Sequence, residues 1–248
     1  MLDVQDVTMR FGGLVAIGGA SLSVPKGAIV GLIGPNGAGK TTLFAVIAGF
    51  LKPTSGRVVF EGADITAEPS HLRARLGIAR TFQIVQPFAG LDVRENIAVG
   101  AYLRHVRSDE AHARAEDVAR RVGLGADLDK SASSLTVAGR KRLELARALA
   151  TEPKLLLLDE VLAGLNPSEI RDIVPVIRAI RDEGVTVLMI EHVMQAVMNL
   201  CEHVHVLAQG RMIAQGTPQA VCADPQVVEA YLGRGAAERL RAQEAGHA

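Results

Sequence analysis

Eight residues near the N-terminus have the types and spacing of a phosphate-binding loop. Residues 34–41 read GPNGAGKT, which matches the P-loop pattern GxxxxGK[ST]. Glycines let the backbone bend until several N–H groups point at one phosphate, and the start of a helix adds partial positive charge. The sequence therefore predicts a nucleotide phosphate site. The residues that we expect to line it here are Asn36, Gly37, Ala38, Gly39, Lys40, Thr41 and Thr42.

Two side chains at the end of this loop have distinct predicted roles. Lys40 is expected to contact the β- and γ-phosphates of the nucleotide. The hydroxyl of Thr41 is expected to bind Mg²⁺. The alternative for the same residues is a glycine turn that carries a solvated lysine.

An apolar run that ends in two acids predicts the second half of the chemistry. Residues 155–158 are all leucine, and Asp159 and Glu160 follow them. Two carboxylates at the end of a buried strand are costly unless positive partners compensate them. Asp159 suits the shell of the Mg²⁺ ion, and Glu160 suits the polarisation of an attacking water.

His192 follows a further apolar run, residues 187–190. A lone histidine is most often an ordinary surface or core residue. At the carboxyl end of a strand in an open α/β sheet, however, ligands bind. We therefore expect His192 to donate a hydrogen bond to a γ-phosphate oxygen or to the attacking water.

The order of the sequence patterns predicts an α/β fold that positions these residues. Short alternating runs near the N-terminus favour an antiparallel sheet. Longer, almost wholly apolar runs are typical of parallel strands that are covered on both faces. Helical patterns lie between the apolar runs and favour a doubly wound core. The alternating runs are residues 2–7, 22–24 and 58–60, and the apolar runs are residues 28–33, 155–158 and 185–190.

Strand patterns give way to helical ones in the middle of the chain. Residues 94–105 and 108–122 read as helices, and a glycine turn predicts a hairpin over residues 204–213. We predict a single domain over residues 1–248 with three parts. They are an α/β core of residues 1–83 and 151–232, an inserted helical subdomain of residues 84–150, and a tail of residues 233–248 that we expect to fray.

Composition limits the possible partners and locations. The 27 basic and 27 acidic residues give no net charge, which argues against a nucleic-acid partner. We accordingly expect the basic cluster at residues 140–142 to be a solvated helix start. No apolar run reaches the ~18 residues that cross a bilayer. Two cysteines without CxxC spacing, and no signal peptide, predict a cytoplasmic location.

Together these residues resemble the nucleotide-binding domain of ABC transporters over essentially the whole chain. The resemblance implies a P-loop NTPase fold, with a RecA-like mixed sheet, an N-terminal antiparallel lobe and a helical subdomain. It implies ATP and Mg²⁺ as cofactors. It also implies that Gln83, in the segment RTFQ, contacts Mg²⁺ or the water and senses a membrane permease. Phe11 stands where the family has an aromatic residue that stacks on adenine, although a core or edge phenylalanine is nearly as good an interpretation.

The resemblance extends to the family's signature loop, LSGGQ, which caps the γ-phosphate of the ATP that a second subunit holds. Counting back from residues 143–147 places the loop at Leu135, Thr136, Val137, Ala138 and Gly139. Thr136 keeps the hydroxyl, but valine and alanine replace the two glycines. If Ala138 has to adopt φ > 0, the cost is about 1 kcal/mol. Either the loop is distorted until ATP arrives, or alanine is tolerated with slower turnover.

Further segments resemble the ATPases of branched-chain amino acid importers. They are residues 65–83, 87–97, 215–218 and 230–233. This branch implies a second ATPase subunit, transmembrane permease subunits and, indirectly, a periplasmic solute-binding protein. It places the chain on the inner face of the cell membrane as a peripheral subunit. Relatives in this branch also carry urea, amides or aromatic acids.

Three other functions compete with this one. A soluble ABC ATPase that acts on ribosomes or DNA usually has two ATPase domains, a coiled coil or basic arms, and the sequence shows none of them. A GTPase needs an NKxD-type motif, which the sequence lacks. A regulatory ATPase subunit of low activity is favoured by Ala138 and Gly139.

Overall fold

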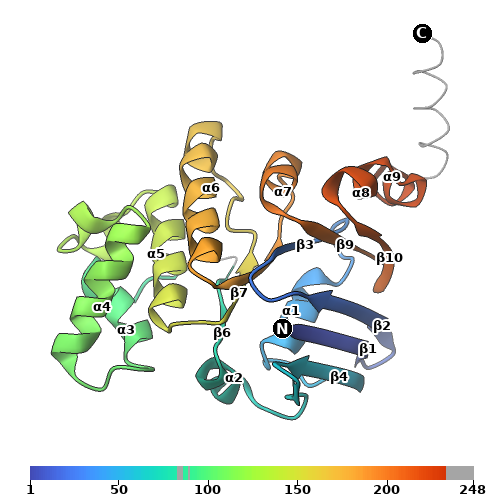
Figure 1. Cartoon of the computed structure of the whole chain (residues 1–248), viewed down its shortest axis with the longest axis horizontal. Coiled ribbons are helices and arrows are strands. Elements are labelled where there is room, and N and C mark those ends of the chain that lie inside the picture. Colours follow the sequence, from blue (N-terminus) through green and yellow to red (C-terminus); the bar gives the residue numbers. More distant parts are fainter. Residues whose placement is uncertain (83–85, 89, 233–248) are drawn as a thin grey trace, which may run out of the picture.

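The computed structural model describes residues 1–82, 86–88 and 90–232. Within these residues the chain forms a four-stranded and a six-stranded sheet, with helices between and around them (Figure 1). The tail that was expected to fray, residues 233–248, lies outside the described residues.

The smaller sheet is antiparallel, as its alternating sequence predicts. Its strand order is β2-β1-β4-β5. Leu2, Val4 and Val7 on one face of β1 are buried, whereas Gln5 and Asp6 are exposed. The strands are β1 (Leu2–Phe11), β2 (Leu14–Val24), β4 (Ser55–Phe60) and β5 (Ala63–Asp64).

The larger sheet is mostly parallel and has the order β10-β9-β3-β8-β7-β6. The three predicted parallel strands and the predicted hairpin are confirmed. The first strand of the hairpin also pairs in parallel with the P-loop strand, which the sequence did not predict. The strands are β3 (Ile29–Ile33), β6 (Ile78–Arg80), β7 (Leu155–Asp159), β8 (Thr186–Ile190), β9 (His203–Ala208) and β10 (Arg211–Gly216).

Both faces of this sheet are covered, which explains why its strands are continuously apolar. Along β7, Leu155 and Leu157 pack with the P-loop helix α1 (Lys40–Ile47) and the antiparallel sheet. Leu156 and Leu158 pack into a second core on the opposite face. Helix α1 therefore lies between the two sheets (Figure 1).

Helices α3 (Val93–Ala101), α4 (Ser108–Arg121) and α5 (Val137–Ala150) pack against one another beside the sheets (Figure 1). The predicted helix over 94–105 is real but shorter. It begins at a capping box, in which Asp92 accepts a hydrogen bond from the N–H of Glu95 and Glu95 accepts one from the N–H of Asp92. The predicted helix over 108–122 is confirmed within one residue.

The remaining α-helices of the described residues each precede or follow a strand of the larger sheet in the chain. They are α2 (Ser70–Leu76), α6 (Pro167–Asp182), α7 (Met194–Leu200), α8 (Pro218–Ala223) and α9 (Pro225–Leu232). In the described part of the chain, no helix combines the length and apolar character that crossing a membrane requires.

Candidate functional site

The P-loop connects the end of β3 to the start of α1 and is packed so tightly that two of its positions require glycine. Gly34 has φ 152°, and a Cβ there would lie 1.9 Å from the carbonyl oxygen of Leu207. Gly39 has φ 105°, and a Cβ there would lie 2.7 Å from the carbonyl oxygen of Ala16. The loop is thus packed between β9 and β2, which contribute the carbonyl oxygens of Leu207 and Ala16.

Lys40 is held at the mouth of this loop. Its Nζ donates hydrogen bonds to the carbonyl oxygens of Gly34, at 2.8 Å, and Pro35, at 3.0 Å. Burial lowers the pKa of Lys40, and the charges of Glu160 and Asp159 oppose this shift. The ammonium group is therefore positioned where an anionic ligand of the loop would meet a largely desolvated charge.

A cavity of about 1180 Å³ opens over the P-loop. The predicted loop residues Asn36, Gly37, Ala38, Gly39, Lys40, Thr41 and Thr42 line it, and so do Glu160 and His192. Phe11 lies at its edge with 47% of its surface exposed, which excludes a core role for this ring. The cavity is somewhat larger than the roughly 300–1,000 Å³ of a typical small-ligand site, so it can hold a nucleotide-sized ligand.

Glu160 and His192 contact each other in the wall of this cavity. The Nε2 atom of His192 lies 2.5 Å from Oε1 of Glu160. Glu160 comes directly after β7 and has φ 51°, a left-handed conformation that is uncommon for a non-glycine residue. Such backbone strain clusters at functional sites, where the surrounding structure holds it.

Asp159 is almost fully buried, with 1% of its surface exposed. Its Oδ2 atom lies 2.7 Å from a guanidinium nitrogen of Arg80, and its backbone N–H donates to the hydroxyl of Thr81 at 3.0 Å. Its other oxygen, Oδ1, is buried and has no hydrogen-bond partner among the described residues. A second cavity brings Asp159 and Thr41 to one surface. A buried carboxylate oxygen near a hydroxyl fits a hard divalent cation such as Mg²⁺.

The expected metal and catalytic residue Gln83 lies outside the described residues. Its neighbour Phe82 is described, and the backbone N–H of Phe82 donates to Oε1 of Glu144 on α5 at 3.3 Å.

The signature segment differs from its expected conformation. Thr136 is the N-cap of α5, and its hydroxyl oxygen accepts a hydrogen bond from the N–H of Gly139 at 3.1 Å. Val137, Ala138 and Gly139 form the first helical turn, and none of them has positive φ. The expected strain at Ala138 is therefore wrong. Valine and alanine favour a helix more than glycine does, which agrees with their place in the first turn of α5. Leu135, which precedes the cap, is buried.

The expectation of a solvated cluster at residues 140–142 is also wrong for its central residue. Lys141 is only 8% exposed, and its Nζ donates to the carbonyl oxygen of Glu160 at 3.0 Å. The helix that begins at Thr136 is thereby tied to the backbone of the predicted catalytic glutamate.

The residues whose place at the cavity was not predicted include Gln209, Gly210 and Tyr231. Gln209 and Gly210 form the β9–β10 turn, and the N–H of Gly210 donates to the carbonyl oxygen of Ala38 at 2.9 Å. Tyr231 on α9 reaches the same cavity; burial raises the pKa of Tyr231, and a backbone hydrogen bond from Gly34 opposes this rise. The sequence patterns put residues 209–210 in a hairpin turn and residues 230–233 in a family-like segment, but only the fold brings these positions to the P-loop.

Glu191 is a buried acid behind the site, with 1% of its surface exposed. Its Oε1 accepts a hydrogen bond from the N–H of Leu162 at 2.9 Å. Burial raises the pKa of Glu191 from 4.5 to about 7. Between these values the folded chain binds more protons than the unfolded chain, so this residue makes the fold less stable as pH rises from 4.5 to 7.

Glu191→Gln is therefore expected to be more stable than wild type at pH 8, by at most about 3 kcal/mol. The advantage should shrink to below about 1 kcal/mol at pH 5, where the wild-type carboxyl is protonated in the folded chain. Urea unfolding at both pH values measures the difference. The exposed Glu202→Gln serves as the control. An equal gap at the two pH values would show that this carboxyl does not titrate as stated.

Comparison with known proteins places the chain in a family. Residues 17–163, more than half of the chain, match the ABC transporter family model. Residues 211–237 match a model described as branched-chain amino acid ATP-binding cassette transporter.

Individual relatives agree with the family models. The chain is 40% identical to the high-affinity branched-chain amino acid transport ATP-binding protein BraF of Pseudomonas aeruginosa, over 94% of this chain and 98% of the relative. It is 39% identical to the corresponding LivG protein of Salmonella typhimurium, with the same coverage. It also resembles a crystal structure of the ADP conformation of an ABC transporter cassette, with a TM-score of 0.86, 35% identity, and 94% and 99% of the two chains covered. The chain belongs to the ABC transporter family, as an ATP-binding subunit that hydrolyses ATP.

Proposed function

We propose that the chain binds Mg·ATP in the cavity over the P-loop and hydrolyses it to drive a separate permease that imports branched-chain amino acids or related small solutes. The observation that carries this proposal is the convergence of Lys40, Asp159, Glu160 and His192 around the P-loop. The similarity to BraF and LivG supports the solute class.

Each of these side chains has a role that its geometry permits. Lys40 neutralises the β- and γ-phosphates, and Phe11 stacks on the base at the exposed edge. Glu160 accepts a proton from the attacking water. His192 lies within hydrogen-bond distance of Glu160 and positions the carboxylate relative to the γ-phosphate. Asp159 and Thr41 would hold Mg²⁺, which supplies charge for the developing negative oxygens. Gln83 is proposed to complete that shell.

A second copy or a related ATPase subunit is proposed to close the site. Thr136 is exposed at the start of α5. Because its oxygen accepts the N–H of Gly139, its O–H remains to donate to a phosphate of the partner's ATP. The helix start adds partial positive charge at the same point. We propose that Leu135, Ala138 and Gly139 position this threonine.

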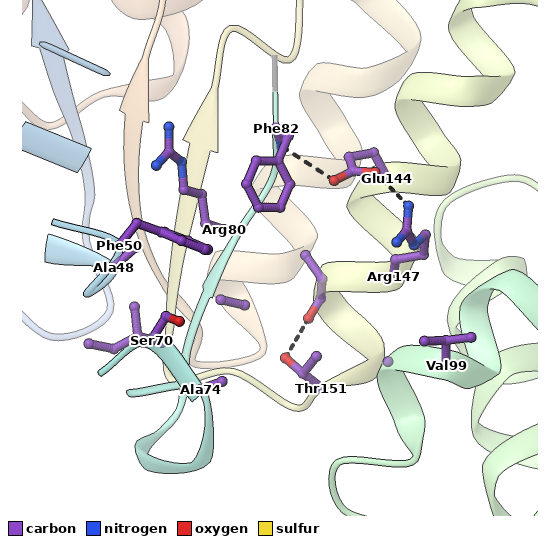
Figure 2. Close-up of a pocket in the computed structure, with 14 residues that line it drawn as sticks. Ala48, Phe50, Ser70, Ala74, Arg80, Phe82, Val99, Glu144, Arg147 and Thr151 are labelled. Carbon is purple, nitrogen blue, oxygen red and sulfur yellow. Dashed lines mark hydrogen bonds and ion pairs between the residues drawn. The ribbon is translucent and has the colours of Figure 1, made fainter. Parts of the chain in front are cut away.

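A groove of about 230 Å³ is the proposed docking place for a cytoplasmic helix of the permease (Figure 2). Phe50, Arg80 and Phe82 line one side, and Glu144 and Arg147 on α5 line the other. Residues 83–85 and 89, which follow Phe82, lie outside the described residues.

The same arrangement implies a place in the cell. We propose that the chain is cytoplasmic and bound peripherally to the inner face of the membrane through the permease. A periplasmic solute-binding protein would act on the outer side and would affect this chain only indirectly.

Reconstitution tests the proposal. The chain should co-purify with the permease subunits, and proteoliposomes that contain both should take up radiolabelled leucine only when ATP is supplied. GTP should compete poorly for the site. ATPase activity that ribosomes or DNA stimulate, and that the permease does not, would support the soluble ABC ATPase instead.

Thr136→Ala tests the role of the signature segment. Loss of the N-cap is expected to destabilise the fold by about 1 kcal/mol, as urea unfolding measures. Turnover should fall, whereas the affinity of the isolated chain for ATP should not, because Thr136 serves the partner's site. Thr136→Ser keeps both the cap and the donor and is the matched control. If alanine weakens ATP binding to the single chain, Thr136 acts within its own site.

A further inference from the structure

Arg80 is the last residue of β6 and lies between the nucleotide site and the groove. Its guanidinium is within 2.7 Å of Oδ2 of Asp159, and the two side chains are only 9% and 1% exposed. The same side chain lines the groove of Figure 2. It therefore contacts the predicted metal carboxylate and forms part of the surface proposed to receive the permease.

Aromatic rings surround the rest of the guanidinium. Its Cζ atom lies 5.9 Å from the ring centroids of Phe44 and of Phe50 and 5.6 Å from that of Phe82. Phe50 and Phe82 contact each other edge to face, with centroids 5.8 Å apart. Both rings are about half exposed in the groove. A guanidinium is weakly hydrated and stacks well on such rings, so the rings can hold Arg80 when the carboxylate releases it.

Arg80 pairs with the Asp159 carboxylate through only part of its guanidinium group. Its Nε is buried and has no hydrogen-bond partner among the described residues. Among the described residues, one ion pair, with Asp159, holds the guanidinium against the attraction of the rings. An arginine that formed two parallel hydrogen bonds with the carboxylate would lose more interaction energy when it moved toward the rings.

We propose that Arg80 is a positioning residue that couples divalent-cation binding at Asp159 to the aromatic wall formed by Phe50 and Phe82. The inference rests on the proposed Mg·ATP site. Asp159 can be neutralised by Arg80 at Oδ2 or by a divalent cation at Oδ1. With a cation in place the guanidinium is repelled, its hold on Oδ2 weakens, and it shifts toward the rings. By reciprocity, a groove occupant that draws Arg80 away tightens cation binding.

A tryptophan reporter tests the groove side of this coupling. The chain has no tryptophan, so Phe50→Trp introduces a single fluorophore next to Arg80. Adding ADP with Mg²⁺ is expected to change its emission, whereas ADP with EDTA is expected to change it much less. The response should disappear in Phe50→Trp/Arg80→Met. Val106→Trp, at a residue that is 91% exposed and outside the groove, should not respond and is the matched control.

The effect of Arg80 on cation binding is tested with a fluorescent ADP analogue. The quantity measured is the affinity for this analogue in Mg²⁺ divided by its affinity in EDTA. Arg80→Met removes a positive charge next to the cation and should raise this ratio by about tenfold, the lower end of what a neighbouring unit charge does to a proton equilibrium. Arg80→Lys keeps the charge and loses the stacking. Its ratio should stay near that of wild type, while the emission change of the Phe50→Trp reporter falls. Far-UV circular dichroism verifies that each variant folds.

The outcomes separate this inference from the function on which it rests. Failure of wild type to bind ADP contradicts the nucleotide site itself. Three results would contradict the role of Arg80. The first is normal ADP binding without any change in the emission of Phe50→Trp. The others are an emission change that persists in Phe50→Trp/Arg80→Met, and an unchanged affinity ratio in a folded Arg80→Met. Because the ratio compares two binding affinities, a general loss of stability does not produce the expected change.

Discussion

Glu160→Gln is expected to lower ATP turnover by about a thousandfold, which is a typical contribution of a positioned general base. The amide can still accept the hydrogen bond from His192, so the site keeps its shape. It cannot take a proton from water. Phosphate release measures turnover, and the binding of a fluorescent ATP analogue should remain close to that of wild type.

The same variant should also report on assembly. If the γ-phosphate holds two subunits together, ATP should accumulate a stable dimer of Glu160→Gln, which light scattering detects. Glu61→Gln, a surface acid paired with Lys154, is the control and should behave as wild type does. Turnover of Glu160→Gln near the wild-type rate would remove Glu160 from its role.

Lys40→Ala has the second largest expected effect and acts on binding instead of chemistry. Loss of a charge-assisted contact to the phosphates should weaken ATP affinity by about 100-fold, or ~2.7 kcal/mol. Isothermal titration measures the affinity. The exposed Lys52→Ala is the matched control.

The interpretation of Lys40→Ala needs one further measurement. The ammonium group also satisfies the carbonyl oxygens of Gly34 and Pro35, so part of the loss could come from a loosened loop. Lys40→Met and Lys40→Ala both lose these contacts, so urea unfolding of each variant without nucleotide measures how much the loop is loosened. Unchanged affinity in both variants would contradict the assignment of residues 34–41 to phosphate binding.

The convergence of Lys40, Glu160 and His192 was predictable because each residue comes at or just after a local sequence pattern. The P-loop pattern gives Lys40 and Thr41, and apolar strands precede Glu160 and His192. Parallel strands bring their carboxyl ends to one edge of a sheet, so residues far apart in sequence converge there. The structure brings Lys40, Glu160 and His192 to one cavity, as that rule requires.

What the sequence analysis missed depends on long-range packing. Strand β6 has only three residues, too few to show a period. Arg80 and Lys141 pair with groups 79 and 19 positions away, and no local pattern reports such a pairing. Tyr231 reaches the cavity from the other end of the chain. The family consensus also misled, since its glycines suggested a left-handed Ala138 where α5 in fact begins.

The contact between Lys141 and the Glu160 carbonyl has a consequence for the proposed pair of subunits. If the proposed function holds, Glu160 serves the ATP on its own P-loop, and Thr136, at the start of the helix that carries Lys141, serves the ATP of the neighbour. The Lys141 ammonium group would then link two reaction centres that hold different nucleotides. A displacement of the glutamate backbone after hydrolysis in one centre would be passed along α5 to the other, so the two nucleotides are expected to be consumed with cooperative kinetics.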